Sequence, residues 1–316
     1  MIGTGVVVVT YNSEEVIGAC LDSCASLPMV VVDNASNDKT IEQVKRRPEV
    51  LLLTNATNRG FATAVNQGEA ALDTEFVLLL NPDVHLQTPV TALRDACSSP
   101  GVGLATGRLL DRAGSVQAGF NIRRFPSPLT LIFEVLGLNR LFPWNGINRR
   151  YRCSDFNPAI AADVEQPAGA FLMFRRDVWK RLNGFDSRFH PLWFEDVDFC
   201  KRAREAGFKI RYVPDVTAVH QGGHSVAKLT RCSRELYWYV SLLKYASKHF
   251  QPYAFRGVSA AVVLGSFLRA VVAVVRWRSL EPVSIFARVM RLAMFSLISG
   301  RVREPGGLPG YGKPVG

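Results

Sequence analysis

The sequence lacks three signatures that mark common classes of protein. Its six cysteines include no Cys-x-x-Cys pair and no framework typical of a small secreted protein, so we expect reduced thiols rather than disulfides or a zinc site. No Gly-x-Gly-x-x-Gly follows the first apolar run, which disfavours a dinucleotide-dependent dehydrogenase. That run begins almost directly after Met1, without a basic segment or cleavage site, so we expect no secretory signal.

A long uncharged hydrophobic run is also missing. Residues 257–275 are rich in Val, Ala and Leu, but Arg269 interrupts them and leaves at most 12 uncharged residues in succession. A membrane-spanning helix needs about 20 mostly apolar residues, and a central arginine costs about 2.5–3.5 kcal/mol on insertion scales. The sequence therefore disfavours a helix that crosses a membrane here.

Positive charge is concentrated toward the carboxyl end. Of the net charge of +11, residues 248–303 carry +8, from nine Lys or Arg and one Glu. Arginines around apolar helices are typical of segments that lie in the plane of an anionic membrane surface, so we expect a basic amphipathic helical extension over 251–303. The alternatives are helices packed on the main domain and, last, nucleic-acid binding, for which no reading motif is present. Residues 304–316 are expected to be disordered.

The rest of the chain alternates strand and helix patterns at the spacing of an α/β fold. Apolar runs typical of strands buried on both faces occupy residues 5–10, 29–33, 50–54, 76–80 and 102–106. Helices are predicted between them over 13–25, 37–46, 61–72 and 88–97. Residues 107–164 form a less regular excursion, and order returns with strands at 169–174, 209–213 and 216–220 and helices at 176–182, 196–206 and up to about 250. The pattern predicts a mostly parallel, Rossmann-like sheet flanked by helices.

Polar residues follow several of these strands. In open α/β sheets ligands bind beyond the carboxyl ends of the strands, where this sequence has Thr10 and Asn12, then Asp33, then Asn81 and Asp83. A carboxylate held at that edge suits Mg²⁺ or Mn²⁺, which are often bound by one or two carboxylates together with substrate phosphates. A Pro-Asp turn is the structural alternative.

Residues 193–202 (Trp-Phe-Glu-Asp-Val-Asp-Phe-Cys-Lys-Arg) place three carboxylates within four residues. Carboxylates beside aromatic side chains tend to be well hydrogen-bonded or to have shifted pKa values, as a general base requires. The alternative is a helix N-terminus, where acidic side chains favour the exposed N–H groups and the helix dipole.

Eight motifs, in this order and spacing, resemble those of the family-2 inverting glycosyltransferases of the GT-A fold, and most of all the rhamnosyltransferase-like branch that builds bacterial surface polysaccharides. They lie at residues 9–12, 32–38, 58–62 with Asn66, 80–83, 169–170, 184–186, 194–198, and at His220 with Ser225. The resemblance covers about residues 4–250. It implies a catalytic domain over 1–250, with a nucleotide-binding half of about 1–106 and an acceptor-binding half of about 165–250.

The resemblance also implies a donor site. The residues that would bind a nucleotide-sugar are Thr10, Asn12, Asp33, Asn58, Arg59, Asn66, Asn81, Asp83 and Ser225. Asp83, with His220 as an additional ligand, would hold the Mn²⁺ or Mg²⁺ that neutralises the diphosphate, and His224 competes with His220 for this role. The sequence has Asn81 where the broader fold has the first acid of Asp-x-Asp, so one charged ligand is lost.

On the acceptor side, the resemblance implies that Asp196 is the general base, which removes the proton of the acceptor hydroxyl. Glu195 would position the acceptor or tune Asp196. Trp193 would stack on a sugar, although burial in the core explains it equally well. We expect Asp198 to cap the helix start and Arg202 to pair with Asp198 at i, i+4.

The expected function is metal-dependent, inverting transfer of a sugar, with dTDP-L-rhamnose as a candidate donor, to a hydroxyl of a polyprenyl-diphosphate-linked or glycan acceptor. Such an enzyme would be cytoplasmic and peripheral, held at the anionic inner face of the cell membrane through residues 251–303, with no nucleic-acid partner. The alternative, encouraged by Asn81, is a catalytically silent nucleotide-sugar-binding or membrane-associated scaffold.

Overall fold

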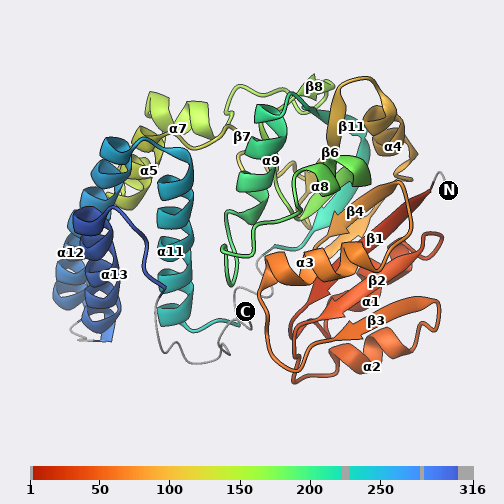
Figure 1. Ribbon diagram of the computed structural model, residues 1–316, viewed down its shortest axis with the longest axis horizontal. Helices are drawn as coiled ribbons and strands as arrows, with labels where there is room; N and C mark the ends of the chain where they lie inside the picture. Colours follow the sequence, from red (N-terminus) through yellow and green to blue (C-terminus); the bar gives the residue numbers. More distant parts are fainter. Residues whose placement is uncertain (1–2, 223–227, 278–280, 305–316) are drawn as a thin grey trace.

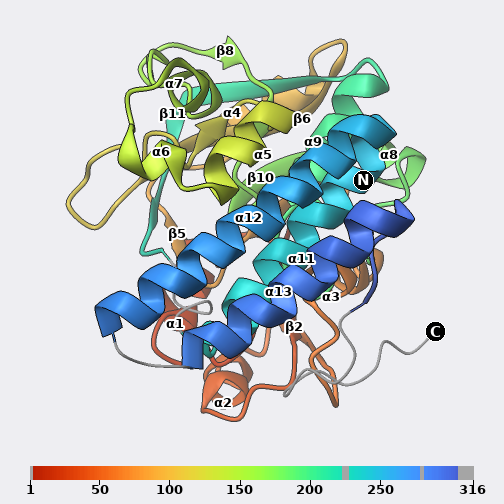
Figure 2. The ribbon, with the colours of Figure 1, turned by 90° about the vertical axis from the view of Figure 1, so that its left-hand side faces the viewer.

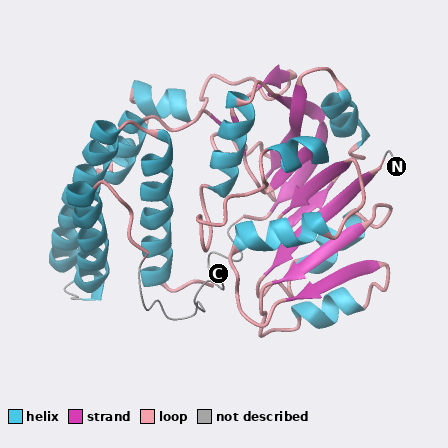
Figure 3. Ribbon diagram, in the orientation of Figure 1, coloured by secondary structure: helices cyan, strands magenta, loops and turns pink. Residues whose placement is uncertain are grey.

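A mixed sheet forms the centre of the protein, seen at the right of Figure 1 and in magenta in Figure 3. The computed structural model describes residues 3–222, 228–277 and 281–304. Within these residues the sheet has nine strands in the order β3-β2-β1-β4-β10-β6-β11-β5, and β8 pairs with β11. The strands are β1 (Thr4–Thr10), β2 (Met29–Asp33), β3 (Val50–Thr54), β4 (Phe76–Leu80), β5 (Val84–Leu86), β6 (Val102–Leu110), β8 (Ala162–Asp163), β10 (Phe171–Arg175) and β11 (Lys209–His220).

The first four long strands run parallel, and β10 runs antiparallel between β4 and β6. The predicted bounds of β2, β3 and β4 are confirmed. The two short strands predicted over 209–213 and 216–220 are one strand, β11, whose register against β6 shifts between Tyr212 and Thr217. Because of this irregularity, β11 remains in the sheet until His220, where it pairs with Val84 of β5.

Two hydrophobic cores cover the two faces of the sheet, because alternate residues of each strand point to opposite sides. Val6 and Val8 of β1 join one core, and Val7 and Val9 join the other. The first core is closed by α1 (Ile17–Ser23), α2 (Thr40–Lys45) and α4 (Thr91–Ser98). The second is closed by α3 (Phe61–Ala70), α8 (Arg176–Arg181) and α9 (Glu195–Glu205). The predicted α/β architecture is confirmed.

The excursion over 107–164 holds more structure than its sequence pattern indicates. Its elements are β7 (Ile122–Arg123), α5 (Pro128–Val135), α6 (Leu138–Leu141) and α7 (Gly146–Tyr151). Strand β7 pairs with β9 (Gln166–Pro167) in a second, two-stranded sheet. Ser127 caps α5 by accepting a hydrogen bond from the Thr130 N–H, as Ser before a helical proline favours.

A third core lies outside the sheet. It joins α5 to α11 (Arg231–His249), α12 (Pro252–Trp277) and α13 (Glu281–Ser299). Figure 2 shows α12 and α13 side by side in front of α11, with α5 and α6 beside them. The carboxyl-terminal helices therefore pack on the rest of the protein, as the packed-helix alternative expects, and one face of them remains exposed.

The packing of α12 on α5 determines where the Arg269 side chain points. Its guanidinium group donates to the carbonyls of Val135 and Glu134 at the end of α5, where unpaired carbonyls attract cations. The charge that interrupts the apolar run therefore points toward α5 rather than outward. By length and composition, residues Pro252–Val272 are long and apolar enough to cross a membrane, and 44% of the most apolar window is buried inside the protein.

Candidate active site

A cavity of about 820 Å³ lies between the carboxyl ends of the parallel strands, the start of α9, and the helices α5 and α11. Thr10 and Asn81 line it where β1 and β4 end, Asp196 lines it from α9, and Trp238 lines it from α11. Figure 1 shows α9 between the sheet and the upright helices on the left. A binding site beyond the carboxyl ends of the strands is the position expected for an open α/β sheet.

Eight of the predicted site residues line this cavity. They are Thr10, Asn58, Asn81, Asp83, Trp193, Glu195, Asp196 and His220. Four others are not among the lining residues: Asn12, Asp33, Arg59 and Asn66. Ser225, like the competing His224, lies outside the described residues.

The residues away from the cavity shape the loops around it. The Asp33 carboxylate accepts from the Thr10 hydroxyl at 3.0 Å and from the backbone N–H of Ser36 at 2.9 Å. Asn12 accepts from the backbone N–H of Asn37 at 2.8 Å. Each of these bonds fixes the turn that follows a strand, in the manner of polar turn residues.

Asn66 and Arg59, which also do not line the cavity, contact other parts of the protein. The Asn66 amide donates to the Phe185 carbonyl at 2.8 Å and accepts from the Phe185 N–H at 3.0 Å. It thereby fastens α3 to the turn that leads toward α9. Arg59 is exposed, and its backbone N–H faces the Asn34 side chain at 3.4 Å.

Asp83 and His220 face one another across 3.6 Å, and both are buried. The His220 ring bonds through Nδ1 to Gln117 Oε1 at 2.9 Å, while the Gln117 amide donates to the His220 carbonyl. Gln117 therefore receives the Nδ1 proton, and Nε2 of the neutral ring presents a lone pair toward the carboxylate. Burial lowers the pKa of His220, and the Asp83 charge opposes this shift.

A carboxylate oxygen and an imidazole nitrogen that face each other without a proton between them are suited to share a cation. Within the described residues no group of three or more His, Cys, Asp or Glu side chains could hold a metal ion. A divalent cation at the Asp83–His220 pair would therefore have to take its remaining ligands from a substrate or water, as Mg²⁺ and Mn²⁺ do at diphosphates.

Asp196 lies at the first turn of α9 with backbone donors on both carboxylate oxygens. Oδ2 accepts from the Gly169 N–H at 2.9 Å, and Oδ1 accepts from the Val197 N–H at 2.8 Å. Burial raises the pKa of Asp196, against the effect of these hydrogen bonds and of the Arg123 charge. A carboxylate with a raised pKa is a stronger base.

Gly169 is required by this contact. A Cβ atom at this position would lie 2.8 Å from the Asp196 Cβ, a separation that packed side chains do not adopt. The glycine therefore lets the backbone that follows β9 approach the carboxylate closely enough to donate its N–H.

Glu195 is buried beside Asp196, and its Oε2 has no hydrogen-bond partner within the described part of the chain. Burial, followed by the nearby charge of Asp196, raises the pKa of Glu195 well above its usual value. An unpartnered buried carboxylate oxygen costs free energy, and a bound ligand or water at the cavity would supply the missing partner.

The two aromatic residues before these carboxylates have left-handed backbones, with φ of 75° at Trp193 and 69° at Phe194. Such conformations are costly for bulky residues and cluster at functional sites. The segment is held by α11, whose Ser241 hydroxyl donates to the Leu192 carbonyl at 2.9 Å. Both Trp193 and Phe194 line the cavity and contact the third core, where Phe194 packs on Tyr245.

Asp198 does not act as a helix cap, which corrects one prediction. Helix α9 begins at Glu195, and its N-cap residue makes no side-chain capping bond. The fully buried Asp198 carboxylate instead contacts two cationic side chains and one imidazole. These are Arg202 at 2.8 Å, Lys248 at 2.7 Å and His249 at 2.7 Å. The predicted pairing with Arg202 is confirmed. Although burial opposes it, the His249 bond and the charges of Arg202 and Lys248 lower the pKa of Asp198.

Several cavity residues were not predicted as site residues: Asn34, Gln117, Arg123, Glu134, Arg152 and Trp238. Asn34 belongs to the polar cluster after β2, so its position at a strand end did indicate a place in the site. Most of the others come from the excursion and from α11, where spacing along the chain gives no indication that they meet at the strand ends.

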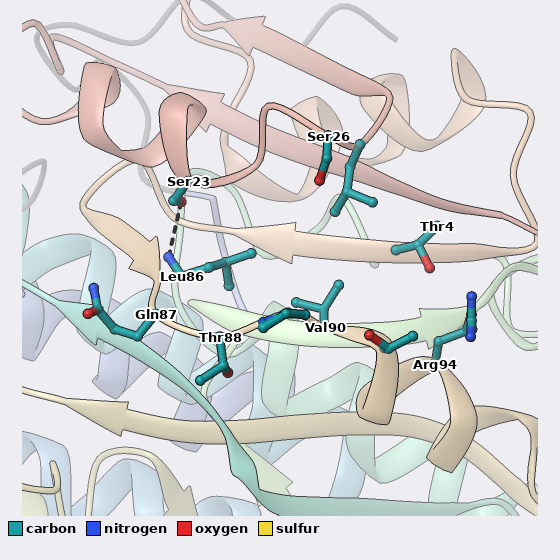
Figure 4. A pocket seen from close by; sticks show the side chains of 11 residues that line it. Thr4, Ser23, Ser26, Leu86, Gln87, Thr88, Val90 and Arg94 are labelled. Atoms are coloured by element: carbon teal, nitrogen blue, oxygen red, sulfur yellow. Dashed lines mark hydrogen bonds between the residues drawn. The ribbon is translucent and has the colours of Figure 1, made fainter.

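A second pocket of about 380 Å³ lies on the first core's side of the sheet, between α1, β5 and α4. Figure 4 shows its side chains, with the Ser23 hydroxyl accepting from the Leu86 N–H at 3.0 Å. It is lined by hydroxyl, amide and aliphatic residues and by Arg94, without a carboxylate, imidazole or aromatic side chain among them. The larger cavity, which has carboxylate and imidazole side chains, is therefore the candidate site for acid-base chemistry.

Comparisons with known proteins identify the family. Residues 5–95 match the model of glycosyl transferase family 2, and residues 133–300 match that of glycosyl transferase family group 2. The N-acetylglucosaminyl-diphospho-decaprenol L-rhamnosyltransferase of Mycobacterium tuberculosis is 32% identical over 242 residues, covering 71% of this chain and 77% of that protein. Rhamnosyltransferase WbbL of Escherichia coli K12 is 28% identical over 171 residues, covering 53% of this chain and 60% of that protein.

Solved structures show the same fold. The mannosyltransferase PcManGT of Pyrobaculum calidifontis, determined with GDP-Man and Mn²⁺, has a TM-score of 0.50 at 19% identity and covers 94% of this chain and 87% of its own. S. aureus TarS residues 1–349 have a TM-score of 0.50 at 15% identity, covering 98% of this chain and 99% of that one. The fold is therefore of the GT-A type, and the chain belongs to glycosyltransferase family 2, in its rhamnosyltransferase-like branch.

Proposed function

We propose that this enzyme transfers a sugar, with inversion, from a nucleoside-diphosphate sugar to a hydroxyl of a lipid-linked or glycan acceptor in cell-surface polysaccharide synthesis. The observation that carries the proposal is that Asp196 and the Asp83–His220 pair line one cavity. Asp196 would provide the base, and the Asp83–His220 pair would provide a place for a cation beside a diphosphate.

Asp196 is the proposed general base. Its backbone donors from Gly169 and Val197 fix the orientation of the carboxylate and leave further lone pairs for the acceptor hydroxyl. As Asp196 removes the proton, the acceptor oxygen attacks the anomeric carbon from the side opposite the departing diphosphate. A single displacement of this kind inverts the anomeric configuration. Glu195, whose Oε2 is unpartnered within the described residues, and the Trp193 ring are the proposed contacts of the acceptor sugar.

The donor is proposed to lie along the ends of β1 and β4. Thr10, Asn58 and Asn81 line that part of the cavity. Asp83 and His220 would hold Mn²⁺ or Mg²⁺, which supplies positive charge to the leaving diphosphate. Asn81 in place of an acid leaves Asp83 as the single carboxylate of this pair, which is why the substrate must complete the coordination. Mn²⁺ is favoured because imidazole suits it better than Mg²⁺.

The donor and acceptor chemistry are part of the same proposal. The M. tuberculosis relative is named for transfer of L-rhamnose to N-acetylglucosaminyl-diphospho-decaprenol. We therefore propose dTDP-L-rhamnose as the first donor to test and a polyprenyl-diphosphate-linked glycan as the acceptor.

Attachment to the inner face of the cell membrane is proposed through the exposed side of α12 and α13. Phe267, Val271 and Val275 of α12 are exposed at helical spacing, and Arg288 and Arg291 are exposed on α13. Apolar side chains beside arginines are typical of helices that lie in an anionic membrane surface. The inward position of Arg269 leaves this side of α12 free of its charge.

The test is transfer from a panel of nucleotide-sugars, including dTDP-L-rhamnose, to a synthetic polyprenyl-diphosphate-linked sugar, with Mn²⁺, with Mg²⁺ or with EDTA. We expect transfer that requires a divalent cation and a product of inverted anomeric configuration by NMR. A product with retained configuration would contradict the single displacement. Binding of donor without any transfer would favour the silent scaffold instead.

A further inference from the structure

Two arginines line the active-site cavity without a carboxylate in ion-pair contact. Arg123 comes from β7, and Arg152 directly follows α7. Over the described ranges 3–222, 228–277 and 281–304, neither forms an ion pair within 4.0 Å. Arg123 interacts with the Asp196 charge only at longer range. A partly buried guanidinium group without a directly paired carboxylate is unfavourable, and arginine recognises phosphate through its planar, forked donors. The pair therefore calls for an anionic ligand.

Gly119 brings the two arginines together. Its carbonyl accepts from Arg123 Nε at 2.7 Å, and a Cβ at this glycine would lie 3.1 Å from the Arg152 Cβ. The residue also has a left-handed backbone, with φ of 70°, which favours glycine. The Gly119 turn thus holds the Arg123 guanidinium group and packs on the stem of Arg152, and both side chains reach the same cavity.

Each arginine keeps donors for a ligand. Arg152 uses Nε on the Asn148 side chain at 3.0 Å, so its two terminal nitrogens remain. Arg123 is held between Phe120 and Tyr151, with its guanidinium carbon 5.5 and 5.8 Å from the two ring centroids. The Tyr151 hydroxyl, 3.5 Å from Arg123 Nη1, adds another donor. This group of side chains offers several N–H and O–H donors to one anion.

The position of this group separates it from the proposed donor site. Phe120 stacks on His220 with 5.1 Å between the ring centroids, and Arg123 lies against the same Phe120 ring. One aromatic ring therefore stands between the Asp83–His220 pair and the arginines. The arginines belong to the excursion, in which α7 and α5 pack together and α5 packs on α12.

The excursion also faces the exposed apolar side of the molecule. Leu141 at the end of α6 and Phe142 and Trp144 between α6 and α7 are exposed, and Figure 2 shows α6 and α7 on the same side as α12. The proposed function places the diphosphate of the nucleotide at the strand ends. The diphosphate of a membrane-lipid acceptor is therefore the one left for the excursion's side of the cavity.

We propose that Arg123, Arg152 and Tyr151 form a second phosphate-binding subsite, which holds the diphosphate of the lipid-linked acceptor. The inference rests on the proposed function, because it assigns the acceptor's diphosphate to a place of its own. In this arrangement the acceptor is anchored by its diphosphate on one side of Asp196, and the donor by its diphosphate on the other.

The test is equilibrium binding of farnesyl diphosphate, a short prenyl diphosphate, to the full chain in EDTA, measured by isothermal titration calorimetry. We expect the double variant R123Q/R152Q to bind it at least tenfold more weakly than the wild type, and each single variant to fall between them. Farnesol, which lacks the diphosphate, should bind both proteins equally. Because the assay needs neither metal nor turnover, its result is independent of whether the wild type transfers a sugar.

The matched control is R124Q, because Arg124 is the exposed neighbour of Arg123 and pairs with Glu165 at 3.0 Å. It should leave farnesyl diphosphate binding unchanged. A second arm measures dTDP binding with Mn²⁺. Weaker dTDP binding in R123Q/R152Q with unchanged farnesyl diphosphate binding would overturn the acceptor assignment in favour of the donor. Unchanged affinity for both ligands in a folded double variant, as judged by circular dichroism, would overturn the subsite altogether.

Discussion

The two sides of α9 give neighbouring carboxylates opposite environments. On the cavity side, Asp196 is held by backbone N–H groups, and burial raises its pKa. On the α11 side, Asp198 is surrounded by Arg202, Lys248 and His249, and its pKa is lowered. The residues lie in one turn of the same helix. The difference shows how one helix can keep a basic carboxylate at the cavity while fixing itself with another.

The Asp198 contacts also explain what holds the cavity side in place. Lys248 bridges Asp198 to Asp186 at 2.7 Å from each, and Arg202 donates to the carbonyls of Leu182 and Gly184. The turn before α9, α9 itself and α11 are therefore joined by one charged network. Such a network is costly to break from one side, so we expect it to keep Asp196 in position.

Replacement of Asp196 by Asn should have the largest effect of the variants considered, and the property affected should be catalytic activity. The amide cannot accept the acceptor's proton, and loss of a general base lowers the rate by about 10²–10⁴-fold. Donor affinity should be unchanged, because Asp196 contacts no donor in the proposed arrangement. The measurement is kcat for transfer together with Kd for the nucleotide. Near-wild-type kcat in D196N would show that the two sides of α9 do not differ as proposed.

Replacement of Asp198 by Asn should instead reduce stability. Arg202 and Lys248 would lose their charge partner and His249 its hydrogen-bond partner, and breaking a buried charged network from one side costs about 3–5 kcal/mol. Because the folded pKa of Asp198 is lowered, its contribution is present above the ordinary Asp range and is lost as pH falls through the folded pKa. The difference in unfolding free energy from the wild type should thus be large at pH 7 and shrink in acid.

The comparison for D198N is D22N, at the exposed Asp22 that pairs with Arg47 at 2.6 Å. A surface pair contributes about 0–1 kcal/mol, so D22N should change urea unfolding at pH 7 only slightly. If D198N were no more destabilised than D22N, the network on the α11 side would not be the anchor of α9.

Replacement of Gly169 by Ala tests the contact that joins the backbone after β9 to Asp196. The added methyl group would lie 2.8 Å from the Asp196 Cβ, so either α9 or the Gly169 backbone must move. Overpacking of this kind costs about 1–3 kcal/mol, and the displaced carboxylate should lower kcat more than it changes the nucleotide Kd. G146A is the control, since a Cβ at Gly146 meets nothing within 4 Å. Unchanged kcat in G169A would show that the Gly169 contact is not needed to position Asp196.

Much of the sheet could be predicted from the sequence, and much of the α11 side could not. Strands β2, β3 and β4 are continuous apolar runs with polar residues after them, so their ends are visible in the chain. The Asp198–Arg202 pair was predicted because i, i+4 spacing on a helix is a local rule. Lys248 and His249 stand about fifty residues away in sequence, and only the packing of α11 on α9 brings them to Asp198.

The residues that line the cavity also divide into those that the sequence could predict and those that it could not. Thr10, Asn81, Asp83 and His220 stand at strand ends, where a general rule for α/β sheets places ligands. Arg123 and Arg152 belong to an excursion without periodicity, so no spacing rule connects them, and Gly119 brings them together only through its left-handed turn. The inward direction of Arg269 was missed for a similar reason, because composition counts a charge without showing which face of the helix carries it.

Replacement of Glu195 by Gln should have the smallest effect and the opposite sign to D198N. Burial raises the folded pKa of Glu195 well above its usual value, so this group stabilises the fold fully below its unfolded pKa and less as pH rises toward the folded pKa. Gln keeps the shape and cannot ionise. E195Q should therefore match the wild type near pH 4 and be more stable by about 1 kcal/mol one pH unit above the ordinary Glu pKa, measured by urea unfolding across pH. E49Q, at an exposed glutamate, should show no such divergence. If E195Q lost stability as pH rose, the carboxylate would be stabilised in its charged form, and the cavity side of α9 would resemble the Asp198 side after all.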